Sequence, residues 1–149
     1  MQLVVFCGIQ ATGKSTFYQQ RFFHSHVRLS LDLLRTRHRE QRLLQVCLET
    51  QMRCVVDNTN PTRAERATYI IPARAAGYEV AGYFFQSVVA EALVRNRQRP
   101  VERQIPDQGI RATRNRLELP ALAEGFAKRY FVRALANQQF VLSDWQDEI

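Results

Sequence analysis

The sequence predicts an α/β domain in which a parallel sheet carries helices on both faces. Short, continuous apolar runs recur along the chain, as expected for strands that are buried on both faces. Segments with a helical spacing of apolar residues lie between these runs. Because strands that alternate with helices favour parallel pairing, we expect residues 1–149 to form one such domain. A chain of this length buries roughly 70% of its unfolded surface, which is enough for one core.

The first part of the chain supplies three of the expected strands. Residues 3–7 form a continuous apolar run, and a glycine-containing loop and a helix at residues 15–23 follow it. Residues 27–30 are a short second strand, after which residues 31–51 show helical spacing in two pieces. Residues 54–57 are the third strand, and a turn-rich segment ends it.

A helix and a fourth strand come next. The helix is expected at residues 62–76, with Thr62 as its N-cap and Glu65 at the spacing of a capping box. Gly77 is typical of the residue that stops a helix. Residues 78–85 are then a strand that continues from this stop.

The last part of the chain contains a basic loop between two helices. Helices are expected at residues 88–97 and 107–117, and residues 98–106 between them are polar, basic and bounded by prolines. This composition predicts a mobile loop. Residues 127–135 and 139–142 are apolar runs of the strand type.

Composition limits the classes of protein to which the chain can belong. No window approaches the ~18 apolar residues that a membrane span needs. The N-terminus has the pattern of a strand and lacks the basic segment of a secretory signal, so we expect a cytoplasmic protein. Cys7, Cys47 and Cys54 are odd in number and form no C-x-x-C pair, which favours small core residues in a reducing compartment.

The positive charge of the chain is concentrated in arginine. The net charge is +7, and only Lys14 and Lys128 of the 21 basic residues are lysines. Coding bias could explain why arginine is more frequent than lysine, but it does not explain where the arginines lie in the sequence. The stretch from Arg95 to Arg116 contains seven arginines and only two acidic residues, so its net charge is +5. Because guanidinium groups match phosphate oxygens, the stretch indicates recognition of phosphate.

The loop after the first strand matches the pattern G-x-x-x-x-G-K-[ST] of a P-loop. It reads Gly8-Ile9-Gln10-Ala11-Thr12-Gly13-Lys14-Ser15. Two glycines let successive backbone N–H groups point at one anion, and the following helix adds the positive end of its dipole. Lys14 is expected to reach the β- and γ-phosphates and Ser15 to ligate Mg²⁺. We expect Lys14 to be exposed in the crevice. The alternative is a glycine-rich turn in which the lysine has no binding role, and it fits the surrounding strand and helix less well.

The pattern assigns a whole segment to the donor nucleotide, which is ATP or another nucleoside triphosphate. The expected contacts are Gly8, Gln10, Ala11, Thr12, Gly13, Lys14, Ser15 and Thr16.

A carboxylate and an arginine follow the second strand. Asp32 lies where the carboxyl ends of parallel strands line the ligand crevice, so it could take the proton of an attacking hydroxyl. Arg35, three residues later, is expected on the same helical face and could hold an acceptor phosphate. The alternative is that Asp32 caps the helix and pairs with Arg35.

Two further groups follow the third strand and the fifth helix. Asp57 ends the third strand and could hold Mg²⁺ through water, whereas the alternative is simple turn chemistry in Asp57-Asn58-Thr59-Asn60-Pro61. Arg95 and Arg99 lie four residues apart at the start of the basic loop and could close over a triphosphate. The alternative for these arginines is a solvated basic face.

Together these motifs resemble the polynucleotide 5′-hydroxyl kinase family, and the resemblance covers residues 3–126. It rests on the order and spacing of the P-loop, Ser30-x-Asp32-x-x-Arg35, Val55-Val56-Asp57-Asn58-Thr59-Asn60-Pro61 and Arg95-Asn96-x-x-Arg99. The fold that it implies is a P-loop kinase sheet with helices on both faces. The activity that it implies is ATP-dependent phosphorylation of a nucleic acid 5′-hydroxyl end, with Mg²⁺.

The resemblance also implies a role for each matched residue. Asp32 would be the general base, and Arg35 would contact the 3′-phosphate of the acceptor nucleotide. Arg99 would be the lid arginine on the donor phosphates, assisted by Arg95. The remaining assignments are Asp57, Asn58 and Thr59 on the acceptor side, and Ser15 and Asp57 at the metal.

The phosphatase half found in some relatives, with its D-x-D-x-[TV] segment, has no match in this sequence. We therefore expect any phosphatase or ligase activity to come from a separate partner protein. Two alternatives to a polynucleotide kinase stay open. One is a kinase of a nucleoside or another small molecule on the same fold, and the other is a nucleotide-binding module that transfers no phosphate.

Overall fold

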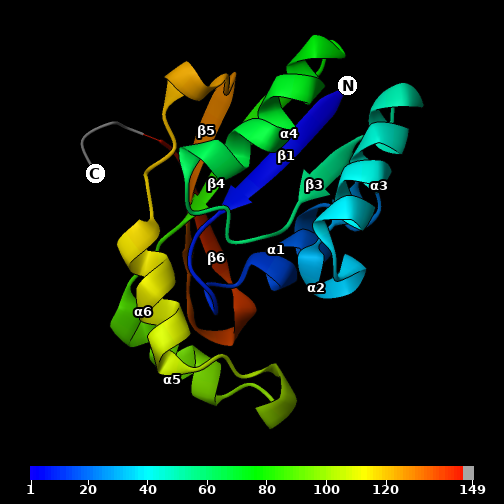
Figure 1. The fold of residues 1–149 in the computed structure, drawn as a ribbon. Coiled ribbons are helices and arrows are strands. Elements are labelled where there is room, and N and C mark those ends of the chain that lie inside the picture. Colours follow the sequence, from blue (N-terminus) through cyan, green and yellow to red (C-terminus); the bar gives the residue numbers. More distant parts are fainter. Residues whose placement is uncertain (146–149) are drawn as a thin grey trace.

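The computed structural model describes residues 1–145, and its centre is one six-stranded sheet (Figure 1). The strands are β1 (Gln2–Cys7), β2 (Val27–Leu29), β3 (Cys54–Val56), β4 (Glu79–Phe85), β5 (Lys128–Ala134) and β6 (Phe140–Asp144). Their order is β2-β3-β1-β4-β5-β6, so the strand before the P-loop is central. The predicted α/β fold class is confirmed.

Within residues 1–145, six α-helices and three short 3-10 helices connect the strands. The α-helices are α1 (Lys14–Arg21), α2 (Leu31–Leu34), α3 (Arg37–Glu49), α4 (Arg63–Ala75), α5 (Val89–Arg97) and α6 (Asp107–Arg116). The 3-10 helices are η1 (Val101–Arg103), η2 (Leu122–Glu124) and η3 (Ala136–Gln138). No helix among residues 1–145 is long and apolar enough to cross a membrane.

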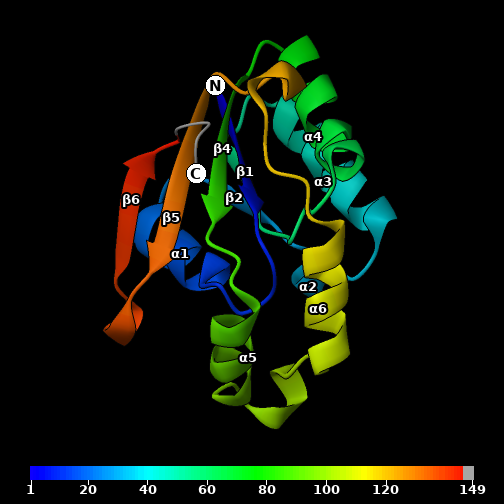
Figure 2. The ribbon, with the colours of Figure 1, turned by 90° about the vertical axis from the view of Figure 1, so that its left-hand side faces the viewer.

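The sheet is covered on both faces, as the sequence predicts (Figure 2). Because side chains alternate along a strand, Leu3 and Val5 of β1 pack in the cluster that contains residues of α3 and α4. Val4 and Phe6 point the other way and pack in the cluster that contains Phe17 of α1. Each apolar run thus supplies side chains to two layers of core.

The sheet departs from the prediction at one edge. Strands β1 to β5 pair in parallel, but β6 runs antiparallel to β5. Only residues 135–139 join these two strands, and this short connection contains η3. Because a parallel pair needs a crossover of a dozen or more residues, so short a connection forces the antiparallel arrangement.

The local signals of the sequence are confirmed where they concern helix ends. Thr62 caps α4, and its hydroxyl accepts a hydrogen bond from the Glu65 amide at 3.2 Å. Gly77 follows the helix with φ of +84°, a conformation that glycine adopts at little cost. The three cysteines are buried, as expected for small core residues.

A buried ion pair fastens α4 to the segment that leads into β5. Arg66 has no exposed surface, and it donates to both carboxylate oxygens of Glu124, at 2.8 and 3.0 Å. The same guanidinium donates to the Asn60 carbonyl at 2.9 Å. The loop after β3 is therefore attached to α4 and to η2 together.

We expect Arg66→Ala to lower the free energy of unfolding by about 3–5 kcal/mol, because it leaves the Glu124 carboxylate buried without its partner. Arg63→Ala is the matched control. Arg63 lies on the same helix and is 3.9 Å from Glu124, but its side chain is 57% exposed, so we expect a change below about 1 kcal/mol. Urea unfolding of both variants measures the difference. Equal losses would contradict the importance of burial at this pair.

Candidate functional site

Loops from three neighbouring strands meet at the carboxyl edge of the sheet. The Gly8 amide donates to the Thr59 carbonyl at 2.9 Å, which joins the loop after β1 to the loop after β3. The Asp57 amide donates to the Leu29 carbonyl at 2.8 Å, which joins the loop after β3 to the end of β2. The P-loop, α2 and residues 57–60 are therefore fixed side by side.

The P-loop has the backbone shape that the glycine pattern predicts. Gly13 has φ of +93° at the start of α1, and a Cβ atom there would lie 2.7 Å from Cε1 of Phe140. Two hydroxyl groups brace the loop: Thr12 Oγ1 donates to the Ile9 carbonyl at 2.9 Å, and Ser87 Oγ accepts from the Ile9 amide at 3.1 Å. The first amides of α1 have no carbonyl partner within the helix, which makes this end suited to an anion.

Lys14 is buried, and the expectation that it is exposed is wrong. Its Nζ atom donates to the carbonyls of Gly8 at 2.9 Å and Ile9 at 2.6 Å, and the residue is 8% exposed. The physical reason is that the long side chain lies over its own loop, whose carbonyls accept its protons. Burial lowers the pKa of Lys14 to about 8, and the nearby Asp57 carboxylate opposes part of this shift.

Ser15 and Asp57 lie together, as the metal assignment requires. Ser15 Oγ donates to Asp57 Oδ2 at 3.2 Å. Arg28, which the sequence analysis missed, pairs with the same Oδ2 through Nε at 2.8 Å and reaches Ser15 Oγ through Nη2 at 3.0 Å. Asp57 thus bonds across the sheet, so the alternative of simple turn chemistry is wrong. A charged residue inside an expected strand was the signal that could have found Arg28.

The donor chemistry of this pair fits Mg²⁺. A hydroxyl and a carboxylate are hard oxygen ligands, and Mg²⁺ is usually held by one or two such groups together with substrate phosphates. Residues 1–145 contain no group of three or more His, Cys, Asp or Glu that could hold a metal ion. The arrangement therefore suits an ion shared with a phosphate chain, to which Ser15 and Asp57 would be the protein ligands.

Asp32 lies exposed on α2, and its relation to Arg35 differs from the prediction. Helix α2 ends at Leu34, and Arg35 has φ of +74°, so the two residues do not share a helical face. Ser30 is the N-cap, and no ion pair joins Asp32 to Arg35 within residues 1–145. The alternative of a capping, ion-paired Asp32 is therefore also wrong.

The residues that we expect to be catalytic are Lys14, Asp32 and Arg99, and they lie within electrostatic reach of one another. Burial lowers the pKa of Arg99, and the Asp32 carboxylate opposes that shift. Arg99 and Asp32 in turn act on the pKa of Lys14, with opposite signs. Arg99 is half-buried, and its role at the donor phosphates stays a prediction beside the alternative of a solvated basic face.

A buried carboxylate that the sequence did not reveal holds α2 in place. Glu40 has no exposed surface, and it accepts hydrogen bonds from the Tyr69 hydroxyl and, at 2.7 Å, from Nδ2 of Asn58. Oδ1 of Asn58 accepts from the Leu31 amide at 2.9 Å. The chain of contacts runs from α3 through Asn58 to the first residue of α2, the helix that carries Asp32.

The basic loop of residues 98–106, called the lid segment below, is held at its two ends by a contact between Asn96 and Ile105. Asn96 is 2% exposed, and its amide donates to the Ile105 carbonyl at 2.6 Å and accepts from the Ile105 amide at 3.0 Å. Between these ends the chain forms η1 rather than an irregular loop. This contact explains the asparagine of the Arg-Asn-x-x-Arg motif. Mobility of the segment stays a prediction.

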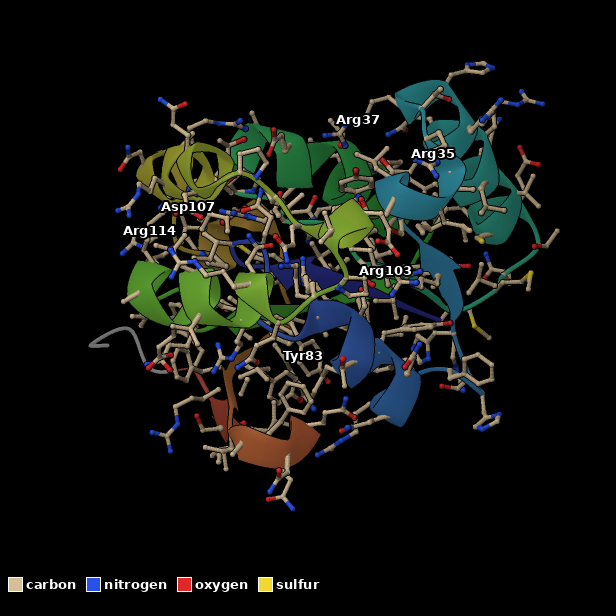
Figure 3. All side chains as sticks on the ribbon, turned by 90° about the horizontal axis from the view of Figure 1, so that it is seen from below. Arg35, Arg37, Tyr83, Arg103, Asp107 and Arg114 are labelled. Carbon is tan, nitrogen blue, oxygen red and sulfur yellow. The ribbon has the colours of Figure 1, made fainter. Side chains whose placement is uncertain are left out.

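The structure divides the arginine-rich stretch into two groups. Four arginines bond to protein groups: Arg95 to the Ala134 carbonyl, Arg97 to Asp107, Arg114 to the Ser87 carbonyl and Arg116 to Glu65. In the view of Figure 3, Arg103 lies nearer to Arg35 than to Asp107 and Arg114. The other three, Arg99, Arg103 and Arg111, take part in no ion pair within residues 1–145, and neither does Arg35, which lies outside the stretch. The number of arginines in this stretch without a protein partner is therefore smaller than the sequence suggested.

A family model described as AAA domain matches residues 3–120, which is most of the chain. The chain belongs to this AAA domain family. A bifunctional polynucleotide phosphatase/kinase of Schizosaccharomyces pombe is 26% identical over 129 residues, which cover 84% of this chain and 32% of the relative. The AAA domain described here thus spans about a third of the length of that relative.

Two solved structures share the fold of this AAA domain. Kti12 of Chaetomium thermophilum, in complex with ADP-AlF3, has a TM-score of 0.70 at 14% identity, covering 91% of this chain and 92% of its own. A gluconokinase of Sinorhizobium meliloti has a TM-score of 0.61 at 16% identity, covering 88% and 81%. At these identities the likeness shows the fold, which is that of a P-loop kinase.

We expect Glu40→Ala to lower the free energy of unfolding of the AAA domain by about 3 kcal/mol, because Tyr69 and Asn58 lose a buried partner. Glu49→Ala on the same helix is the control. Glu49 is exposed, so its removal is expected to change stability by less than about 0.5 kcal/mol. Chemical denaturation tests both variants, and a Glu40 variant as stable as the control would show that the network contributes little.

The lowered pKa of Lys14 predicts a particular dependence of stability on pH. From about pH 8 to 10.5 the unfolded chain keeps the proton and the folded chain loses it, so rising pH favours the folded state. Lys14→Met removes the group. We expect the stability of the wild type, measured relative to this variant by urea unfolding, to rise by up to roughly 1.4 kcal/mol per pH unit in that range. If the free energies of unfolding of the wild type and Lys14→Met changed in parallel with pH, the lowered pKa of Lys14 would be contradicted.

Proposed function

We propose that this AAA domain transfers the γ-phosphate of ATP, or of another nucleoside triphosphate, to the 5′-hydroxyl end of a nucleic acid. The observation that carries the proposal is the position of Asp32. Its carboxylate is exposed on α2, close enough to Arg99 and Lys14 to act on the pKa of each. An exposed carboxylate beside a phosphate-binding loop suits a general base for a hydroxyl acceptor.

The nucleic acid acceptor is supported by two observations. The 26% identical relative is a bifunctional polynucleotide phosphatase/kinase, although this chain spans only about a third of that protein. Arg35 and Arg103 lie at the same edge of the sheet and are exposed, so they can meet phosphate groups of an acceptor. A neutral small molecule would need no such pair.

We assign the roles from the sequence motifs, supported by the contacts of the structure. The donor triphosphate would lie on the P-loop residues and the two lid arginines: Gly8, Gln10, Ala11, Thr12, Gly13, Lys14, Ser15, Thr16, Arg95 and Arg99. Ser15 and Asp57 would hold Mg²⁺, which supplies charge neutralisation for the phosphate oxygens. Arg35 would bind the 3′-phosphate of the acceptor nucleotide. The Thr59 carbonyl accepts from the Gly8 amide, so Thr59 would contribute to the acceptor side through its backbone position.

Asn58 is assigned a different role from the predicted substrate contact. Both ends of its amide already bond to the protein, one to Glu40 and the other to the Leu31 amide. We therefore assign Asn58 to positioning α2, and with it Asp32.

In the transfer step, the acceptor oxygen attacks the γ-phosphorus while its proton passes to the Asp32 carboxylate. The bond between the γ-phosphorus and the β–γ bridging oxygen breaks, and the nucleoside diphosphate leaves with that electron pair. Lys14 and Arg99 would neutralise the charge that develops on the phosphate oxygens. Lys14 is buried and Arg99 is half-buried, so water screens their attraction to the phosphate less than it would at the surface.

One assay tests the function directly. Transfer of labelled γ-phosphate is measured to 5′-hydroxyl oligonucleotides of RNA and DNA, with nucleosides and small polyols, gluconate among them, as competing acceptors. We expect oligonucleotides to be the preferred acceptors by at least tenfold in kcat/KM. A preference for a small molecule would favour the alternative, a P-loop kinase like the gluconokinase in fold. Transfer to no acceptor would favour a module that only binds nucleotide.

Asp32→Asn separates the acceptor chemistry from donor binding. The substitution removes the base and leaves the P-loop untouched, so we expect turnover to fall by roughly 10²-fold or more while ATP affinity stays within several-fold. Turnover comes from the transfer assay and affinity from calorimetry. Near wild-type turnover would remove Asp32 from the role of base.

The lid offers a matched pair of arginines. Arg99 is half-buried near Asp32, whereas Arg97 is exposed and pairs with Asp107 at 3.3 Å. We expect Arg99→Ala to lower kcat by roughly 10²-fold or more, and to lower it more than it weakens ATP binding, because charge moves on the phosphate during transfer. Arg97→Ala should change kcat by less than about threefold. A larger loss of kcat in Arg97→Ala than in Arg99→Ala would mean that the motif has been matched to the wrong arginine of the lid segment.

A further inference from the structure

A third side chain lies across the two residues that would hold the metal ion. Arg28 is the middle residue of β2, and its guanidinium reaches Asp57 Oδ2 at 2.8 Å and Ser15 Oγ at 3.0 Å. Ser15 Oγ donates to the same carboxylate oxygen at 3.2 Å. The three side chains form a closed triangle of hydrogen bonds, and Oδ2 of Asp57 is a corner of it.

The charge of Asp57 explains why a cation lies there. The side chain of Asp57 is only 2% exposed, and a carboxylate so buried needs a compensating charge. Arg28 is its one ion-pair partner within residues 1–145. Lys14 also lies close enough to feel the carboxylate, but its Nζ atom bonds to loop carbonyls. The stability of the buried carboxylate therefore depends on Arg28.

We propose that Arg28 is a positioning residue that competes with a divalent cation for Oδ2 of Asp57, and so links metal binding to the arrival of the triphosphate. A cation that binds Oδ2 directly must displace the guanidinium, and this displacement lowers its affinity for the protein alone. Phosphate oxygens add ligands for the cation and a new anionic partner for Arg28. The inference rests on the proposed function only in taking Ser15 and Asp57 as the metal ligands.

The surroundings of Arg28 allow this displacement. Its side chain is 26% exposed, so it can move without opening the core. Its guanidinium carbon lies 5.8 Å from the centroid of the Tyr18 ring, at the distance of a cation–π contact. The ring can hold the arginine after Oδ2 is released.

The test measures Mn²⁺ binding without nucleotide or acceptor, by titration calorimetry and by the Mn²⁺ paramagnetic resonance signal. We expect Arg28→Met to bind Mn²⁺ about tenfold more tightly than the wild type, because Asp57 then has no competing cation. Arg28→Lys keeps a cation but loses the two-point contact of the guanidinium, so its Mn²⁺ affinity should fall between those of the wild type and Arg28→Met. Arg21→Met is the matched control: Arg21 is an exposed arginine of α1 that lies over the Phe17 ring, so its loss should change nothing.

A measurement of thermal stability shows whether the gain in Mn²⁺ affinity of Arg28→Met depends on Asp57. Arg28→Met should lower the thermal midpoint, and Mn²⁺ should restore it in this variant but not in the wild type. Adding Asp57→Asn to Arg28→Met should remove both the loss of stability and the response to Mn²⁺. Arg28→Gln, which keeps a hydrogen-bond donor without the charge, replaces Arg28→Met in every arm if the methionine variant fails to fold.

Three results would overturn the role of Arg28: equal Mn²⁺ affinity in the wild type and Arg28→Met, no Mn²⁺ binding by either, or a gain that survives Asp57→Asn. The kinase proposal fails on other grounds. A domain that shows the expected Mn²⁺ pattern but transfers no phosphate would overturn the activity and leave the role of Arg28 intact.

Discussion

The hydrogen bond between the Gly8 amide and the Thr59 carbonyl joins the loops after β1 and β3, and the geometry of the site depends on it. These loops belong to adjacent parallel strands, so their ends meet at one edge of the sheet. The bond from the Asp57 amide to the Leu29 carbonyl extends the same edge to β2. A phosphate-binding loop, a metal-type carboxylate and the helix that carries Asp32 are thereby held in fixed relation.

Buried charge divides the polar residues of the domain into two groups. Glu40, Asp57 and Arg66 are buried, and each bonds to partners from other elements. Their contribution is to position loops, because removing a partner would leave a charge that water does not reach. Asp32 and Arg35 are exposed and have no ion-pair partner within residues 1–145. These are the groups that a ligand can meet.

The fold of this domain does not determine which acceptor it phosphorylates. A P-loop kinase sheet is shared with proteins as different as Kti12 and a gluconokinase, so the sheet and the P-loop do not select the acceptor. Selection has to come from groups on the loops around the crevice, such as Arg35 and Arg103. That is why the proposed acceptor rests on these side chains and on one relative, and why the competition assay decides it.

The sequence by itself determined the features whose signals are local. The glycine pattern before Lys14 predicted the loop between β1 and α1, and Thr62 predicted the start of α4. Continuous apolar runs, separated by segments of helical spacing, predicted a sheet with two covered faces. In each case the deciding residues lie within a few positions of one another. Such signals depend on backbone conformation and periodicity, which a linear pattern records.

Only the tertiary structure decided which charged residues meet. Arg28 and Asp57 are 29 positions apart, Ser15 and Asp57 are 42 apart, and Glu40 reaches Tyr69 across 29 positions. The burial of Lys14 and the end of α2 before Arg35 likewise depend on how loops pack. A sequence pattern gives the type of each residue, but the free energy of a buried charge depends on partners that folding brings from distant parts of the chain.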